Sequence, residues 1–376
     1  MGSINKRNMS FEERKAYRRK KRLIRKIQVY AELGLIAVAL IACTVFVVTN
    51  VLGHGSKDKT QAKESLEVQE TEVVEESKGL KVGAMASTEE EEIVEDESQE
   101  EQAQSQYSAK EIDSVKSLDA ATIVSPYGIL INNDTKEIVA TKNSYDRIVP
   151  ASMTKVLTVL VAADHITEDQ LNEKVTLSHE AVDYSYAGGG STSGFVEGEE
   201  VTVKDLFYGT VLPSGGDAAA QLAMYVAGDV DSFVNMMNDK VKELGLDQSS
   251  HFTNPVGFYS DDHYSTCYDM AIIMMAALDN PVCKEVLSTK VYYSSQTNVN
   301  PEGIIISNWF LRRIEDKDIG GEIQGAKTGY VDESKSCAVS SMISASGTNY
   351  ICCTAKSSSS WQCIYDHVAI YKNLTQ

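Results

Sequence analysis

A serine and a lysine lie three residues apart in the segment Pro150-Ala151-Ser152-Met153-Thr154-Lys155. If the chain is helical from Ser152 onward, residues i and i+3 share one face, so the Ser152 hydroxyl and the Lys155 amine project together. A neutral amine at that distance can take the proton of the hydroxyl without help from a histidine. The pair therefore predicts a serine nucleophile with a lysine as its general base.

The same spacing of serine and lysine occurs at Ser3 to Lys6 and at Ser56 to Lys59. Those pairs lie in a basic tail and in a polar linker, where no pocket can lower the pKa of a lysine. Only the third pair is followed by a long apolar run, Val156 to Ala163, which predicts a helix that buries its lysine. Pro150 suits the entry to that helix, and the unpaired N–H groups of its first turn can stabilise an oxyanion.

Two further polar motifs lie downstream. Ser214-Gly215-Gly216-Asp217 lies between two predicted helices, and Lys327-Thr328-Gly329 lies in the strand-like segment 325–331. An unperturbed lysine titrates near pH 10.4, so a base that works at pH 7 needs its pKa lowered by about 3, at a cost of about 4 kcal/mol. Burial beside a second cation lowers it, and Lys327 is predicted to be that cation.

Taken together, Ser152, Lys155, Ser214 and the Lys327-Thr328-Gly329 motif resemble the penicillin-interacting serine peptidases. Within that group the chain is most similar to the D-alanyl-D-alanine carboxypeptidase family of low-molecular-weight penicillin-binding proteins. The resemblance covers residues 120 to 375 and extends to three segments outside the motifs, 198–203, 243–246 and 251–258. The order and spacing of the motifs carry the resemblance, because each motif alone is short.

The resemblance implies a role for each reacting group. Ser152 would attack the carbonyl of the penultimate D-alanine of a peptidoglycan pentapeptide and become acylated, while Lys155 takes its proton. Ser214 would relay a proton toward the leaving D-alanine. β-Lactam antibiotics would acylate the same serine, and neither a metal nor another cofactor is required.

The resemblance also implies a substrate-binding edge. Lys327 and Thr328 would hold the terminal carboxylate of the substrate, and Gly329 would leave room for the substrate to lie along the strand edge as an added strand. The backbone N–H groups of Ser152 and Tyr330 would form the oxyanion hole.

One motif position departs from the family pattern, since Gly216 stands where the family usually has an Asn that contacts both the lysine and the substrate amide. Its loss removes about 1–3 kcal/mol of polar contact unless a water or another side chain fills the gap. The alternative to an active enzyme is therefore a catalytically impaired homologue that binds peptidoglycan or regulates its synthesis.

A class A β-lactamase is a further alternative, because the resemblance implies that it shares the fold. Such an enzyme needs a deacylating Glu in a Glu-x-x-Leu-Asn loop. The segment Glu243-Leu244-Gly245-Leu246-Asp247 is similar to that loop but is predicted to be the end of a helix, which makes Glu243 an ordinary helix-terminal residue.

The pattern of elements after residue 114 predicts an α+β fold, with an antiparallel sheet, flanking helices and an inserted helical lobe. Predicted strands lie at both ends of this region and predicted helices lie between them. The predicted strands cover 127–131, 137–140, 304–306, 338–343 and 350–354; the predicted helices cover 203–212, 217–227, a stretch capped by Asp231 and ending at Leu244, one from residue 265 or 266 to before Pro281, and 359–374. The resemblance implies a β-lactamase or transpeptidase-like arrangement with the active site between the lobes.

Charge is unevenly distributed along the 376 residues, whose net charge is −19. Residues 1–30 form a basic tail with eleven Lys and Arg against two Glu up to residue 26, and residues 31–52 are predicted to form a transmembrane helix. The basic flank predicts a cytoplasmic N-terminus and an extracytoplasmic domain at 114–376. A cleaved signal peptide is the alternative, disfavoured by the length of the basic and apolar stretches.

Residues 53–113 are rich in Glu, Ser, Gln and Lys, which predicts a disordered acidic linker. The resemblance implies peptidoglycan and β-lactams as partners, the predicted transmembrane helix adds the membrane, and no role for nucleic acid is expected.

The histidines and cysteines are predicted to be structural. His251 and His263 lie near the family-like segment 251–258, and no pair of histidines has metal-ligand spacing. Cys43 falls in the predicted membrane span, and the six later cysteines are expected to be mostly buried thiols, with one bridge possible. The Gly188-Gly189-Gly190 run, near Tyr184 and Tyr186, is either a mobile wall of the cleft or an inert loop.

Overall fold

The computed structural model describes residues 106–119 and 121–375, so the predicted basic tail, the predicted membrane helix, Cys43 and most of the acidic linker lie outside the described residues. Within the described part, none of the helices combines the length and the apolar character needed to cross a membrane. The last linker residues already pack on the domain, because Lys110 pairs with Glu137 and the Ala109 N–H donates to the Tyr268 hydroxyl at 3.0 Å.

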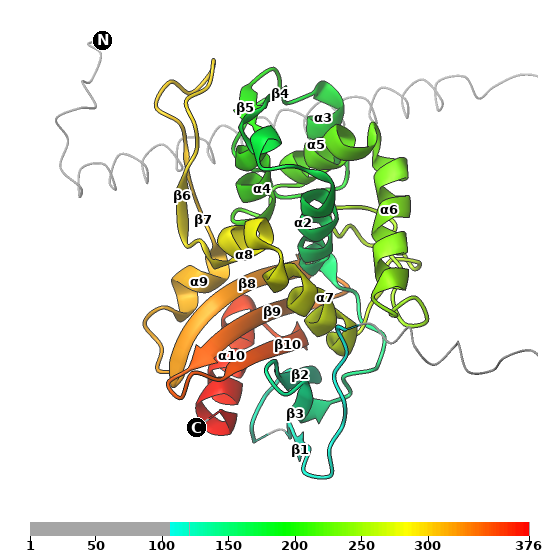
Figure 1. The fold of residues 1–376 in the computed structure, drawn as a ribbon, viewed down its shortest axis with the longest axis vertical. Helices are drawn as coiled ribbons and strands as arrows, with labels where there is room; N and C mark the ends of the chain where they lie inside the picture. Colours follow the sequence, from blue (N-terminus) through cyan, green and yellow to red (C-terminus); the bar gives the residue numbers. More distant parts are fainter. Residues whose placement is uncertain (1–105, 120, 376) are drawn as a thin grey trace, which may run out of the picture. The chain divides into compact units, whose positions relative to one another are not determined.

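A six-stranded sheet in the order β1-β3-β2-β10-β9-β8 forms one half of the domain (Figure 1). Its strands are β1 (Lys116–Ser117), β2 (Tyr127–Asn132), β3 (Glu137–Lys142), β8 (Gly321–Val331), β9 (Lys335–Ser344) and β10 (Asn349–Ser357). All neighbours are antiparallel except β1 and β3. The strands from the two ends of the sequence meet where β2 pairs with β10, as the α+β prediction requires.

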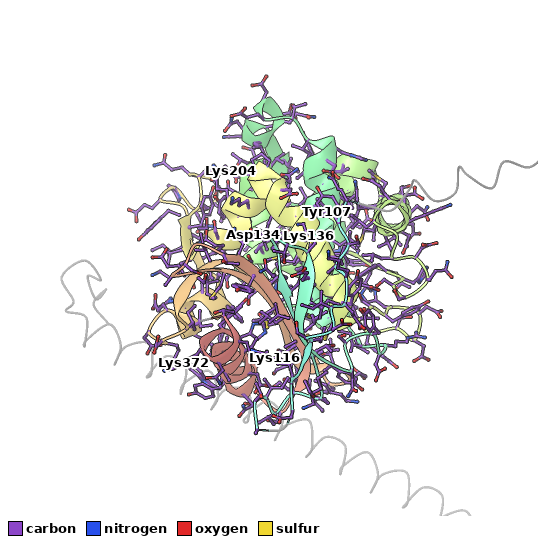
Figure 2. The ribbon with its side chains drawn as sticks, turned by 60° about the horizontal axis from the view of Figure 1, so that its bottom comes forward. Tyr107, Lys116, Asp134, Lys136, Lys204 and Lys372 are labelled. Atoms are coloured by element: carbon purple, nitrogen blue, oxygen red, sulfur yellow. The ribbon has the colours of Figure 1, made fainter. Side chains whose placement is uncertain are left out.

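Two hydrophobic cores lie on opposite faces of this sheet because successive side chains of a strand point to opposite sides. Cys353 faces the core that includes α7 (Cys267–Asp279), whereas Cys352 faces the core that includes α10 (Ser360–Leu374). The adjacent cysteines therefore cannot act as one unit. All six cysteines of the described part are buried free thiols, which confirms the prediction. Figure 2 views the molecule from the sheet end, with Lys116 marking β1 and Lys372 marking α10.

A helical lobe is inserted between β3 and β8 and lies above the sheet in Figure 1. It contains η3 (Ala151–Met153), α2 (Thr154–His165), η4 (Asp169–Asn172), α3 (His179–Ala187), α4 (Val203–Val211), α5 (Gly216–Ala227), α6 (Val230–Glu243) and the ribbon β4 (Lys174–Thr176) with β5 (Glu200–Thr202). α2 runs through the middle of the lobe, with nine of its residues buried, so its N-terminus is held rigidly against the sheet.

Most predicted helix boundaries follow from capping chemistry. Thr202 caps α4 through a capping box with Asp205, and Thr266 caps α7 by accepting from the Asp269 N–H at 2.9 Å, as the sequence predicts. The predicted cap of α6 is wrong, because Asp229 rather than Asp231 accepts from the Ser232 N–H. Asp229 and Asp231 both carry a carboxylate that can accept from a backbone N–H. The conformation of the preceding turn determines that Asp229 is the N-cap.

Several elements were not predicted from the sequence, among them α3, α8 (Pro281–Ser288), α9 (Trp309–Ile314) and β6 (Val291–Tyr293). The predicted strand at 304–306 exists as β7 (Ile305–Ser307), but it pairs with β6 in a separate ribbon instead of joining the main sheet. α9 packs between β8 and α10, which brings its side chains to the edge of the sheet.

Candidate active site

Ser152 lies in the 3-10 turn η3, which leads directly into α2, so it sits two residues before the first residue of that α-helix. Lys155 is in the first turn of α2, and its Nζ lies 3.1 Å from Ser152 Oγ. The predicted i, i+3 proximity is therefore present. The preceding residue, Ala151, has a φ of +47°, a backbone conformation that L-residues avoid. Such strain at the nucleophile is stable only because the surrounding packing fixes it.

Lys155 is completely buried and makes its second contact with a backbone carbonyl, that of Val256, at 2.7 Å. Burial lowers the pKa of Lys155 well below its ordinary value, the positive charge of Lys327 lowers it further, and Asp217 opposes the change. The desolvation effect is the larger of the two, because a buried ammonium loses most of its hydration. Lys155 is therefore suited to be a neutral base at the pH where an ordinary lysine is charged.

Lys327 approaches the same centre from β8, and its Nζ donates to Ser214 Oγ at 2.9 Å and to the Thr328 carbonyl at 2.8 Å. It is also buried, and that burial lowers the pKa of Lys327 to about 7. Two lysines and two serines from three separate segments thus converge, with Ser152 on Lys155 and Ser214 on Lys327. The structure brings together all four residues that the sequence selects for catalysis.

Val256 is held by the side chain of Asn254 in the loop after α6. Asn254 Oδ1 accepts from the N–H groups of Val256, Gly257 and Phe258 at 3.1, 2.7 and 2.9 Å. Gly257 has a φ of +94°, and a Cβ there would lie 1.9 Å from the carbonyl oxygen of Ala151. The loop can therefore press against the nucleophile turn only with glycine at 257.

His263 connects this loop to the start of α2. Its Nδ1 accepts from the Thr253 N–H at 3.0 Å, so the proton is on Nε2, which donates to Thr154 Oγ1 at 2.8 Å. Burial lowers the pKa of His263 to about 3, which keeps the ring neutral. His263 thus has a structural position beside the site, as the sequence predicts, and His251 lies at the surface with its Nδ1 2.7 Å from the Asp262 carbonyl oxygen.

Gly329 is where β8 and the nucleophile turn approach each other most closely. A Cβ at 329 would lie 2.7 Å from Cys337 Sγ, 2.8 Å from the Pro150 carbonyl and 3.0 Å from the Ser152 nitrogen. Because β8 is the outermost strand of the sheet, the edge facing the nucleophile has no strand partner within the described part of the chain. The Ser152 N–H and the neighbouring Tyr330 backbone are therefore adjacent to a free strand edge.

A cleft of about 500 Å³ opens along this edge, a size typical of small-ligand sites. The predicted site residues that line it are Ser152, Ser214, Thr328, Gly329 and Tyr330. Lys155 and Lys327 lie buried beneath them. Gly189 and Ser191 also line the cleft, so the glycine run contributes one residue to the cleft wall, which favours the first of the two readings of this segment.

Some residues singled out by sequence are not in the cleft. Gly216 is buried and does not line it. Glu243 is the last residue of α6, where it forms an exposed ion pair with Lys240, and so it is not placed as a deacylating base. Among residues 106–119 and 121–375 no three His, Cys, Asp or Glu side chains are grouped so as to hold a metal ion.

Arg313 of α9 is a cleft residue that sequence reasoning missed. Its guanidinium lies 4.5 Å from the ring centre of Trp309 and 5.1 Å from that of Trp361, and both rings are about half exposed. The spacing of Trp309 and Arg313, one helical turn apart, was the available signal. It could not reveal that Trp361, from α10, completes the stack.

Residues 114–353 match the family model described as D-alanyl-D-alanine carboxypeptidase. The chain is 34% identical over 215 residues to the Bacillus subtilis D-alanyl-D-alanine carboxypeptidase DacF, which is 57% of this chain and 52% of that protein. It is 32% identical over 226 residues to a D-alanyl-D-alanine carboxypeptidase of Streptomyces sp. K15, or 58% of this chain and 76% of that protein.

The solved structure of the Streptomyces K15 DD-transpeptidase is similar throughout most of its length. It has a TM-score of 0.58 and 31% identity, and the match covers 66% of this chain and 95% of that one. The chain nevertheless spans only about half the length of several of the relatives, including DacF and the Escherichia coli DacA.

The charge of Lys327 should set the pH range in which Ser152 reacts. Because Lys327 lowers the pKa of Lys155, replacing it (Lys327→Met) should raise that pKa, and a neutral Lys155 would then require a higher pH. We expect the acid limb of Ser152 acylation by a fluorescent penicillin to move up by about 1 pH unit, in addition to a lower maximal rate.

The matched control for that experiment is Lys204→Met. Lys204 is a surface lysine, labelled in Figure 2, that pairs with Glu285 and should leave the profile unchanged. An acid limb that stays in place in Lys327→Met, or moves to lower pH, would show that Lys327 does not control the ionisation of Lys155.

Proposed function

Because the chain belongs to the D-alanyl-D-alanine carboxypeptidase family, we propose that residues 114–376 are a serine peptidase that removes the terminal D-alanine from peptidoglycan stem peptides. The observation that supports this most strongly is the pair formed by Lys155 Nζ and Ser152 Oγ at 3.1 Å, with burial lowering the pKa of the lysine. β-Lactams would inhibit it by acylating the same serine.

In the acylation step, Ser152 Oγ attacks the carbonyl carbon of the penultimate D-alanine while its proton passes to Lys155 Nζ. The resulting oxyanion is stabilised by the backbone N–H groups of Ser152 and Tyr330, which flank the close contact at Gly329. Collapse breaks the peptide C–N bond and leaves an ester on Ser152. The proton that Lys155 accepted then passes through Ser214, whose hydroxyl is hydrogen-bonded to Lys327, to the leaving amine, so Lys155 is neutral again before water enters.

In the deacylation step, water replaces the departed D-alanine and attacks the ester carbonyl. Lys155 again takes a proton, now from the water, and returns it to Ser152 Oγ as the ester bond breaks. Each cycle consumes one water and one substrate peptide, and it releases one D-alanine and the peptide shortened by that residue. No metal or other cofactor takes part in the proposed cycle.

The substrate peptide is proposed to bind as an added strand along the free edge of β8. Thr328 lines the cleft, and its hydroxyl would donate to the terminal carboxylate. Lys327, which the family pattern assigns to the same carboxylate, is buried and already donates to Ser214 and to the Thr328 carbonyl. We therefore propose that Lys327 attracts the substrate carboxylate from its buried position without touching it. A second cation would form the hydrogen bonds to that carboxylate.

Arg313 is suited to be that second cation. Arginine keeps its charge at all relevant pH values and can bind a carboxylate with two parallel hydrogen bonds. Within the described residues no carboxylate pairs with Arg313, and two indole rings hold its guanidinium at the cleft. Its hydrogen-bond donors remain available to a ligand.

Acyl transfer to an amine is a second candidate activity. It is supported by the Streptomyces K15 structure, whose protein is described as a DD-transpeptidase and which matches this chain along 95% of its length. An amine that enters in place of water would attack the same ester. Gly216 supports the further alternative of an impaired homologue, and the assay below separates all three.

The residues before the domain are proposed to anchor it to the membrane as a single-pass protein. Residues 31–52 would span the bilayer with the basic tail in the cytoplasm, which leaves the domain outside. The linker of about sixty residues would separate its ends by roughly 40–50 Å as a flexible coil. This proposal rests on the sequence pattern alone.

We expect D-alanine to be released from diacyl-L-Lys-D-Ala-D-Ala by the wild-type protein and not by Ser152→Ala, because the acyl-enzyme cannot form without the hydroxyl. The control is Ser346→Ala, in the exposed turn between β9 and β10. Coupled-enzyme detection of D-alanine measures hydrolysis, and mass spectrometry with added glycinamide measures transpeptidation. Wild-type protein that is not acylated by a fluorescent penicillin and releases no D-alanine would favour the impaired homologue.

Replacing Arg313 with Gln should raise KM for the same peptide by about tenfold, since a charge-assisted hydrogen bond to the carboxylate contributes about 1.5–3 kcal/mol. A peptide whose C-terminus is a carboxamide should be turned over equally by wild type and variant. Arg312→Gln is the matched control, because Arg312 directly precedes Arg313 in the chain and its guanidinium donates to the Ser307 hydroxyl. An equal loss on both peptides would mean that Arg313 only supports the fold.

Membrane fractionation tests the anchor. The full chain should sediment with membranes and resist extraction by high salt, and proteases added outside the cell should release a fragment containing Ser152, detected by its fluorescent penicillin label. A mature protein that begins after residue 52 and is recovered in the soluble fraction would support a cleaved signal peptide instead.

A further inference from the structure

The space beside Gly216 is already filled by another helix. A Cβ at residue 216 would lie 2.5 Å from Ser185 Oγ, 3.1 Å from Val256 Cγ1 and 3.2 Å from Ser185 Cβ. Ser185 belongs to α3, which packs against α5 (Figure 1), and its side chain is only 2% exposed. Any side chain at 216 would therefore have to displace the Ser185 hydroxyl.

The Ser185 hydroxyl and the Gly216 backbone share one acceptor. Ser185 Oγ donates to the carbonyl of Ser191 at 3.3 Å, and the Gly216 N–H donates to that same carbonyl at 2.7 Å. Ser191 also forms a backbone bridge with Gly215. The Ser191 carbonyl thus joins α3 to the turn that carries Ser214.

That turn is strained. Ser214 has a φ of +64°, which costs a non-glycine residue of the order of 1 kcal/mol or more. Besides the Ser191 carbonyl, the turn is held by the Gly215 N–H, which donates to the Gly209 carbonyl at 2.9 Å, and by Asp217 Oδ1, which accepts from the Ser193 N–H at 2.8 Å. These bonds keep Ser214 Oγ within 2.9 Å of Lys327 Nζ.

We propose that Ser185 is a positioning residue of the active site, which occupies from α3 the space of the missing side chain at 216 and holds the Ser214 turn through the Ser191 carbonyl. We call residues 185 and 216 the exchanged pair, because the polar side chain of residue 185 fills the space that a side chain at residue 216 would need. The role given to Ser214 in this inference rests on the proposed function. The steric part, that a side chain at 216 cannot coexist with the Ser185 hydroxyl in its present position, does not.

Val256 links the space beside residue 216 to the general base Lys155. Val256 Cγ1 lies 3.1 Å from the Cβ position of residue 216, and the Val256 carbonyl accepts from Lys155 Nζ at 2.7 Å. A side chain added at 216 without a change at 185 would push on both neighbours at once. It would disturb the acceptor of Lys155 as well as the turn of Ser214.

A double-mutant cycle on the full chain tests the pair. Gly216→Asn alone should slow Ser152 acylation by a fluorescent penicillin by at least about tenfold, and Ser185→Gly in the same protein should restore most of the rate, since contacting residues couple strongly. Ser185→Ala alone should lower the rate with little change in the penicillin concentration giving half-maximal rate. Gly228→Asn is the matched control, at the other end of α5, where a Cβ meets nothing within 4 Å and Asn tolerates the positive φ.

Thermal unfolding of the same proteins separates this inference from the proposed function. If wild type is not acylated at all, the proposed function fails, but Gly216→Asn should still lower Tm and Ser185→Gly should still recover it. If the effects of Gly216→Asn and Ser185→Gly on the acylation rate and on Tm were simply additive, the proposed coupling between residues 185 and 216 would be wrong. A Gly216→Asn protein as active and stable as wild type would also overturn the exchanged pair. Ser185→Ala with an unchanged acylation rate would overturn the positioning role.

Discussion

The constraint on which the structure depends is the burial of two lysines at one point. A buried ammonium loses hydration that hydrogen bonds only partly replace, so each lysine favours its neutral form. Lys155 is the more affected, because it experiences both its own desolvation and the charge of Lys327. The base thus exists only while the sheet, which carries Lys327, and the helical lobe, which carries Lys155, are packed together without water between them.

That packing is possible because glycine stands at both points of closest approach. At Gly329 the strand β8 approaches the nitrogen of Ser152, and at Gly257 the Asn254 loop approaches the backbone of Ala151. Side chains at either position would separate the segments and admit water to Lys155. The strained conformations of Ala151 and Ser214 lie on the same contact surface, so tertiary packing stabilises the backbone that local preference disfavours.

The α+β fold, the inserted lobe and the Ser152–Lys155 pair were predicted from local signals in the sequence, and the resemblance to a family added Ser214 and Lys327 to that pair. Capping residues mark α4 and α7, short apolar runs next to turn residues mark the strands β2 and β3, and the motif residues are recognised by their type and spacing. What the sequence did not reveal depends on neighbours distant in the chain. Arg313 belongs to the cleft because α10 supplies Trp361, and β7 leaves the main sheet because β6 pairs with it.

Gly216 shows that the effect of a changed motif residue depends on which neighbouring side chains fill the space around it, and not on the residue type alone. Read alone, a glycine in place of a polar residue indicates a weakened site. In the structure that volume is occupied by Ser185, and Lys155 keeps an acceptor in the Val256 carbonyl. Since interiors are close-packed, the space of a side chain missing from one element is filled by water or by a side chain from an adjacent element. A homologous site can therefore keep its geometry while its motif changes, provided that the two positions change together.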